Sequence, residues 1–139
     1  MKHDVILPEK DFFNIHFLPE REIFQMTFDR QNYMIIAKDD VGNFIGIAPD
    51  KQIIFLDTMY EGDEQGLIYI AKDIETFLKE IQLYQQYGET PYPDHPSKDF
   101  LETYETNFRE LISSLDADAF CSENTFWSTA AEEMGYGII

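Results

Sequence analysis

The stretch that decides the fold runs from residue 33 to residue 71 and reads YMIIAKDDVGNFIGIAPDKQIIFLDTMYEGDEQGLIYIA. In it, short apolar segments rich in β-branched and aromatic residues alternate with polar turns that contain Gly, Pro, Asn or Asp. This alternation predicts strands at residues 33–37, 44–47, 52–56 and 67–70. Turns this short join strands that run in opposite directions, which favours an antiparallel meander. Residues 23–28 (IFQMTF) add a further predicted strand on the N-terminal side.

The second half of the chain changes to a helical period. Asp73 is a suitable N-cap for a helix whose apolar residues follow at three- and four-residue spacing, and Gly88 supplies its end. Ser97 caps a second helix, and a third begins near Asn124 and ends at Gly135. Strands followed by helices are typical of an α+β fold. We therefore expect an antiparallel sheet of four to six strands with C-terminal helices packed on one face.

Length and composition predict a single domain that spans residues 1–139. A chain of 139 residues with 44% hydrophobic and 15% aromatic residues can bury enough apolar surface to offset its conformational entropy. The charge is strongly negative, with 27 Asp and Glu against 10 Lys and Arg for a net charge of −17. Nucleic acids and anionic membranes both attract clustered cations, so this balance argues against either as a ligand. It favours a basic protein partner instead.

Cysteine content and hydropathy predict a cytoplasmic protein. Cys121 is the only cysteine, so no disulfide can form within the chain. Its apolar neighbours Ala119 and Phe120 predict a packed or half-buried thiol. The first residues, MKHDVILPEKDFF, lack the long apolar stretch of a signal peptide, and no run in the sequence approaches the ~18 apolar residues of a membrane span.

The sequence contains no motif that predicts catalysis, a metal or a cofactor. None of the three histidines, at positions 3, 16 and 95, lies in a nucleophile motif, and no glycine-rich phosphate-binding loop occurs. Four acids gather in the loop after the third strand of the meander: Asp57, Glu61, Asp63 and Glu64. From Asp57 onward their spacing matches only fragments of an EF-hand, which favours a solvated loop. A small metal-dependent hydrolase that uses this loop is the alternative.

Negative charge is concentrated in the second half of the sequence. From Glu80 to the C-terminus there are 12 acids and only two bases, Lys98 and Arg109. Acids of the second predicted helix lie off its apolar stripe and are expected to face water: Asp99, Glu102, Glu105 and Glu110. Two interpretations stay open, an ordinary solvated face that keeps the protein soluble and a docking face for a cationic partner.

Several motifs follow one another in a familiar order over roughly residues 33–139. A glycine-containing strand (FIGI) precedes a strand that ends in Asp (QIIFLD), and an acidic loop then leads to an IA…FL strand-to-helix junction. An LD..A segment comes before a last helix that carries the only Trp. This order resembles the SUKH (Smi/Knr-like) superfamily. Gly46 then serves close packing within the sheet, while Phe77, Leu78 and Trp127 seat helices and are structural residues.

The resemblance implies a binding function. Many bacterial members of the superfamily look like immunity proteins that bind and silence toxin domains, frequently nucleases, whereas fungal members are regulatory scaffolds. It therefore implies a non-catalytic, acidic protein, without a cofactor, that neutralises a toxin domain. A regulatory scaffold or general protein-interaction module is the main alternative. The acids expected to meet a basic partner are Asp57, Glu61, Asp63, Glu64, Glu102 and Glu105.

Overall fold

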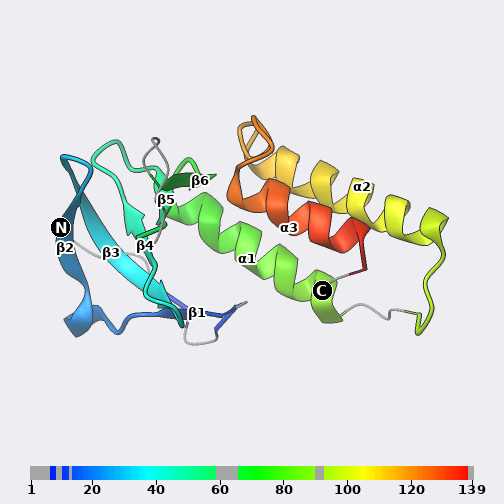
Figure 1. Ribbon diagram of the computed structural model, residues 1–139, viewed down its shortest axis with the longest axis horizontal. Coiled ribbons are helices and arrows are strands. Elements are labelled where there is room, and N and C mark those ends of the chain that lie inside the picture. The colour runs from blue at the N-terminus through cyan, green and yellow to red at the C-terminus, as the bar shows by residue number, and fades with distance from the viewer. Residues whose placement is uncertain (1–6, 9–10, 13, 59–65, 90–92, 138–139) are drawn as a thin grey trace.

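The computed structural model describes residues 7–8, 11–12, 14–58, 66–89 and 93–137 and has an α+β architecture (Figure 1). In chain order its elements are β1 (Ile15–Phe17), the 3-10 turn η1 (Glu20–Glu22), β2 (Phe24–Phe28), β3 (Gln31–Asp39), β4 (Phe44–Ile47), β5 (Ile53–Leu56), β6 (Leu67–Ala71), α1 (Ile74–Glu89), α2 (Lys98–Leu115) and α3 (Phe126–Gly135). Within these ranges, six antiparallel strands form one sheet and precede the helices. The predicted fold class is confirmed.

The sheet is organised around β3, which is nine residues long. The strand order is β1-β3-β4-β5-β6, and β2 also pairs with β3. β2 pairs with the first part of β3 and β1 with its end, both along the edge opposite to β4. A two-residue turn joins β2 to β3. Its residues Asp29 (φ 49°) and Arg30 (φ 67°) adopt the left-handed conformation that such tight hairpins require.

The element ends differ from the sequence prediction in instructive ways. Each predicted strand is present, with its ends shifted by two residues or fewer. β1 was not predicted, because three residues are too few to show an alternation. Gly88 was wrongly predicted to end the first helix, since α1 continues to Glu89. A glycine in the last helical turn lowers helix stability only slightly, and helix packing can offset that loss. α3 begins at Phe126, after an N-cap at Thr125, slightly later than expected from Asn124.

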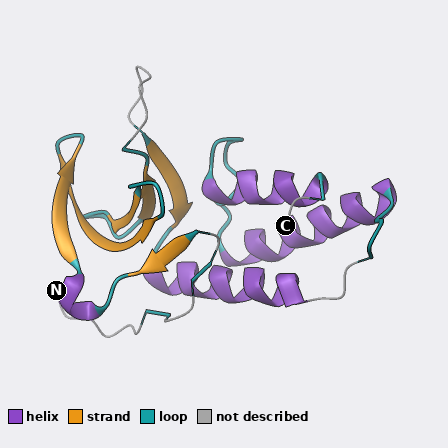
Figure 2. Ribbon diagram, turned by 60° about the horizontal axis from the view of Figure 1, so that its bottom comes forward, coloured by secondary structure: helices purple, strands orange, loops and turns teal. Residues whose placement is uncertain are grey.

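Both faces of the sheet carry apolar side chains. Ile45, Ile53 and Ile70 contribute to a large core that the helices complete. A second cluster on the other face contains Leu18, Tyr33, Ile35, Ala48, Ile54 and Leu56. Neighbours in a strand, such as Ile53 and Ile54, alternate between the two clusters as the pleat requires. The sheet is curled (Figure 2). The residues of the second cluster come from its strands and from the chain segments next to them.

Gly46 allows the closest packing within this curled sheet. A Cβ atom at position 46 would lie 2.9 Å from the Cβ of Tyr33 and 3.2 Å from the Cδ1 of Ile35. Carbon atoms do not pack this closely, so a larger residue would push β3 and β4 apart. The missing side chain lets Tyr33, which is only 2% exposed, cover the strand.

The helical layer extends the molecule away from the sheet (Figure 1). α1 and α3 contact β6, and α2 packs against both of them. Trp127 is fully buried at their junction, with its ring 5.9 Å from those of Tyr84 and Phe108. Phe77 is also fully buried, whereas Leu78 is half-buried at the rim of the same core. Among the described helices, none is both long enough and apolar enough to span a membrane.

Each helix begins with a side-chain cap. Asp73 Oδ1 accepts a hydrogen bond from the Thr76 backbone N–H (2.8 Å), and Ser97 Oγ accepts one from Phe100 (3.0 Å). Thr125 Oγ1 accepts from the Ser128 N–H at 3.3 Å. These bonds satisfy backbone donors that have no partner inside the helix. The caps at Asp73 and Ser97 are those predicted from the sequence.

Candidate functional site

The acidic residues predicted to meet a partner come from two separate parts of the molecule. Asp57 follows β5, is half-buried, and donates its backbone N–H to the Gly66 carbonyl at 2.7 Å. Glu102 and Glu105 lie in the first half of α2, which begins at the end of the helical layer farthest from the sheet (Figure 1). The structure therefore does not bring Asp57 together with these glutamates. The predicted contact residues Glu61, Asp63 and Glu64 lie outside the described residues.

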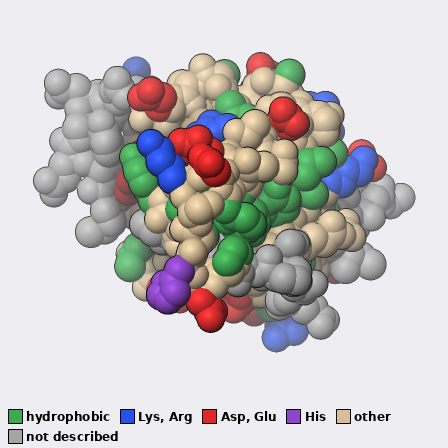
Figure 3. Space-filling view, turned by 90° about the vertical axis from the view of Figure 1, so that its right-hand side faces the viewer, with side chains coloured by type: hydrophobic (Ala, Val, Ile, Leu, Met, Phe, Trp, Pro, Cys, Tyr) green, Lys and Arg blue, Asp and Glu red, His purple; other side chains and the backbone are tan. Residues whose placement is uncertain are grey.

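A groove of about 820 Å³ runs between α2 and α3. We call it the α2–α3 groove. It is lined by Lys98, Glu102, Glu105 and Arg109 from α2, by Phe120, Ser122 and Glu123 from the connecting loop, and by Ser128, Glu132, Gly135 and Tyr136 from α3 and its end. Figure 3 looks onto the end of the helical layer that lies farthest from the sheet, where acidic, basic and hydrophobic side chains lie close together on the surface. Glu102 and Glu105 thus belong to one concave surface.

Glu105 forms part of the floor of the α2–α3 groove. Its carboxylate accepts a hydrogen bond from Arg109 Nε at 2.6 Å, and the Arg109 guanidinium lies 5.1 Å from the centre of the Phe120 ring. A Cβ atom at Gly135 would collide with the Glu105 carboxylate, so the glycine makes room for it. The prediction that Glu105 faces water is wrong: 27% of its side chain is exposed. Helix packing, which local periodicity does not report, holds it against α3.

Glu102 agrees with the prediction and is exposed. Its only ion pair among the described residues is with Lys98, one turn earlier, at 3.9 Å. Both side chains of this pair are largely solvated, and such surface pairs contribute little to stability. Glu102 is therefore free to exchange Lys98 for a cation of another molecule at small cost.

Sequence reasoning predicted only Glu102 and Glu105 among the residues of the α2–α3 groove, and it missed Glu123, Glu132 and Tyr136 on the opposite side. Helical spacing contained part of the signal. Lys98, Glu102, Glu105 and Arg109 follow one another at intervals of four, three and four residues, which places them along one side of a helix. Glu132 and Tyr136 are similarly one turn apart. What the spacing did not reveal is that these two rows face each other.

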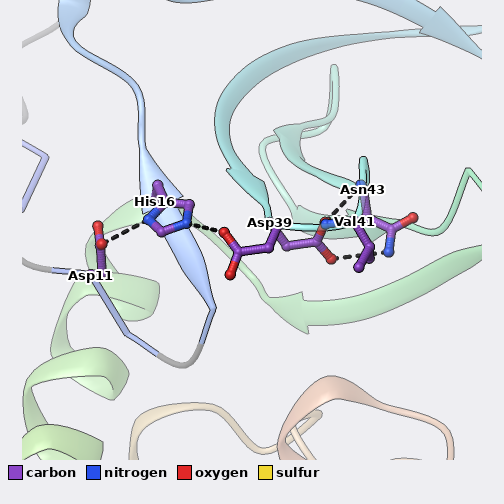
Figure 4. A network of polar contacts seen from close by, with 6 residues as sticks. Asp11, His16, Asp39, Val41 and Asn43 are labelled. Atoms are coloured by element: carbon purple, nitrogen blue, oxygen red, sulfur yellow. Dashed lines mark hydrogen bonds and ion pairs between the residues drawn. The ribbon is translucent and has the colours of Figure 1, made fainter.

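A second polar arrangement surrounds His16 in β1 (Figure 4). Its Nδ1 lies 2.7 Å from Asp11 Oδ2 and its Nε2 lies 2.5 Å from Asp40 Oδ1. The hydrogen bonds with Asp40 and then Asp11 raise the pKa of His16 above 6.5, since they favour the protonated ring. A histidine that activates a nucleophile needs one ring nitrogen to accept its proton. Here both nitrogens face carboxylates, so His16 is suited to holding the chain before β1 against the β3–β4 turn.

The β3–β4 turn is itself held by Asp39, which lies beside the His16 arrangement. Its Oδ1 accepts hydrogen bonds from the backbone N–H groups of Val41 (3.0 Å) and Asn43 (2.8 Å). Burial tends to raise the pKa of this carboxyl, but these bonds outweigh it and the pKa is lowered. Asn43 in turn accepts from the backbone N–H of Thr58 at 3.0 Å. The network ties the end of β3 to the chain after β5 and is structural.

Two buried carboxyl groups lie where the helices meet the sheet. Asp116 accepts hydrogen bonds from the Tyr69 hydroxyl (2.7 Å) and the Lys72 backbone N–H (3.1 Å), so it joins the end of α2 to β6. Glu80 in α1 is fully buried, and neither of its carboxylate oxygens has a well-formed hydrogen bond. Burial raises the pKa of Glu80 to about 8, an effect that the nearby Trp127 indole only partly offsets. Glu80 is therefore protonated at neutral pH.

Metal-binding and thiol chemistry have little support in the described part of the chain. In it, no group of three or more His, Cys, Asp or Glu side chains is placed to hold a metal ion. Cys121 is exposed, so the prediction of a packed thiol was wrong. Ala119 is buried and Phe120 half-buried, and the turn that they anchor leaves the next residue on the outside.

No family model matches this chain, and neither a curated protein nor a solved structure does. The resemblance to the SUKH superfamily accordingly stays a sequence-based prediction.

Proposed function

We propose that this chain is a non-catalytic acidic binding protein, of the immunity type, that neutralises a basic toxin domain by binding it. The observation that carries the proposal is the charge of the helical layer. Both of its cations between residues 93 and 137, Lys98 and Arg109, are already paired with glutamates of α2. Most of the other acids in this range are exposed and make no ion pair with any described residue. The layer therefore presents unbalanced negative charge to a partner.

A nuclease domain is a fitting partner on physical grounds. Enzymes that bind nucleic acids carry clustered Lys and Arg to contact phosphates. An acidic protein can cover the same cations, which blocks substrate binding without any chemistry of its own. Complementary charge also speeds the encounter and disfavours wrong partners. Fast and selective association suits a protein that must bind a toxin before the toxin acts on its substrate.

Co-expression with candidate basic toxin domains encoded beside its gene tests this proposal, and the absence of any such domain would count against it. We expect the chain to restore growth and to elute with the toxin domain as a stable complex in size-exclusion chromatography. We also expect the association rate to fall steeply as added salt shortens the Debye length from ~30 Å to ~8 Å. Unrelieved toxicity together with separate elution would contradict the proposal and favour a regulatory scaffold.

A further inference from the structure

The α2–α3 groove offers two walls of different character. On the α2 side, Glu102 and Glu105 have cationic neighbours in Lys98 and Arg109. On the other side, Glu123 and Glu132 are exposed and make no ion pair with any residue that the structure describes. Four glutamates against one lysine and one arginine leave the groove negative, and the excess lies on the α3 side. A cationic side chain entering the groove would meet these two unpaired carboxylates.

An aromatic residue stands at the end of the same wall. Tyr136 is 72% exposed, the largest exposed fraction among the exposed large hydrophobic side chains of the described residues. It is one helical turn beyond Glu132, and both line the groove. An arginine side chain can stack on an aromatic ring while its guanidinium donates hydrogen bonds to a carboxylate. Glu132 and Tyr136 together provide both kinds of contact.

The floor of the α2–α3 groove is preorganised. Arg109 lies over the Phe120 ring and bonds Glu105, and Gly135 leaves space for that carboxylate. The floor of the groove therefore keeps its shape without a partner, so that side-chain freedom is lost on binding mainly by the exposed residues Glu123, Glu132 and Tyr136. A second hollow, between α1 and α2, measures about 260 Å³ and is lined by one lysine and by uncharged residues. It offers nothing to attract a cation.

We propose that the α2–α3 groove is the docking site for the toxin partner and that it receives an arginine-bearing basic segment of that partner. The inference rests on the proposed function for the identity of the partner. It adds the surface, the residues and the chemistry of the contact. The loop after Asp57, expected from the sequence to share the contact, is not required by it.

The test uses two variants of the full chain with the same net charge. In the first, Glu123→Lys and Glu132→Lys reverse two acids of the groove. In the second, Asp94→Lys and Glu110→Lys reverse two exposed acids that do not line it. All four side chains are exposed, so both variants are expected to fold, as circular dichroism will verify. Any effect of overall charge is equal in the two.

The probe is a short capped peptide rich in arginine, titrated into ¹⁵N-labelled protein at low salt. We expect the largest amide shift changes at Ser122, Glu132 and Tyr136, and a dissociation constant about tenfold weaker in the groove variant than in the control variant. Replacing Tyr136 by Ala should weaken binding about threefold or more. Equal weakening in the two charge variants, or shifts spread over the whole acidic surface, would overturn the groove as the site.

The toxin domain found by co-expression is then measured against the same variants. Loss of protection and of binding only in the groove variant supports the inference. Full protection by the groove variant would overturn the inference while the proposed function stands. Conversely, groove-specific peptide binding without any protection from the toxin would overturn the proposed function and the toxin as the partner, while the groove as a site for an arginine-bearing segment stands. The two failures are therefore distinguishable.

Discussion

Glu80 makes the stability of this protein depend on pH. Its carboxyl is fully buried, and its pKa is raised from 4.5 to about 8, chiefly by burial. Asp116 and Asp73 add to the rise, whereas the Trp127 indole and Lys72 oppose it. Between these two pKa values the folded protein keeps a proton that the unfolded chain releases. Stability therefore falls as pH rises through this window, by about 1.4 kcal/mol per pH unit.

Replacing Glu80 with Gln removes this ionisation and keeps the shape of the protonated side chain. Relative to the wild type, we expect the free energy of unfolding of Glu80→Gln to gain about 3 kcal/mol between pH 4.5 and pH 7 and about 4 kcal/mol by pH 8. The comparison between pH values matters more than the absolute value at one pH, because the Gln amide also has to be accommodated in the core.

Urea denaturation of both proteins at pH 5, 6, 7 and 8 measures this difference. The pKa of His16 is also raised, but His16 is present in both proteins, so its contribution cancels in the comparison. Glu80→Ala is the control: it leaves a cavity and is less stable at pH 5, yet it should show the same weak pH dependence as Glu80→Gln. If the free energies of unfolding of the wild type and Glu80→Gln change with pH in parallel, the conclusion that Glu80 is buried and protonated is refuted.

Three further predictions concern the His16 arrangement and the core. The imidazole of His16 should titrate with a pKa above 6.5 in NMR, and this pKa should shift back toward 6.5 in Asp40→Asn. Since the pKa is raised, the stability that the contacts of His16 with Asp11 and Asp40 contribute is present below pH 6.5 and lost as pH rises through the folded pKa. Trp127→Ala should lower the free energy of unfolding by about 3–5 kcal/mol, and a loss under 1 kcal/mol would contradict its place in the core. Gly46→Ala should cost about 1–3 kcal/mol in the same assay because its Cβ would collide with Tyr33; a neutral result would mean that β3 and β4 separate freely.

The fold was predictable from the sequence where local signals were sufficient. Short apolar runs between polar turns located β3 to β6, and Asp73 and Ser97 located two helix starts, because caps and turns depend on residues close in sequence. β1 depends on pairing with Asp39 and its neighbours, which are 20 to 24 residues away. No local pattern reports such a contact.

The candidate site was predictable only in part, for a related reason. Counting charges located the acidic half of the chain, and helical spacing placed Glu102 on a solvated side. The groove itself exists because α3 packs beside α2, with the buried Trp127 in the core beneath them. That packing also explains why Glu105 is half-buried and why Tyr136 lines the groove. Sequence-local reasoning had favoured the acidic loop after Asp57.

The arrangement of β1 and β2 along one side of β3 replaces a long edge of the sheet with two short ones. An uncovered strand edge offers unpaired backbone groups to another copy of the chain and is a common starting point for aggregation. Here two short strands in succession pair with eight of the nine residues of β3. β1 closes the last part, opposite Ala37 to Asp39. Shortening the N-terminus beyond Phe17 would uncover that segment, so an expressed fragment that begins later is a poor choice for work at high concentration.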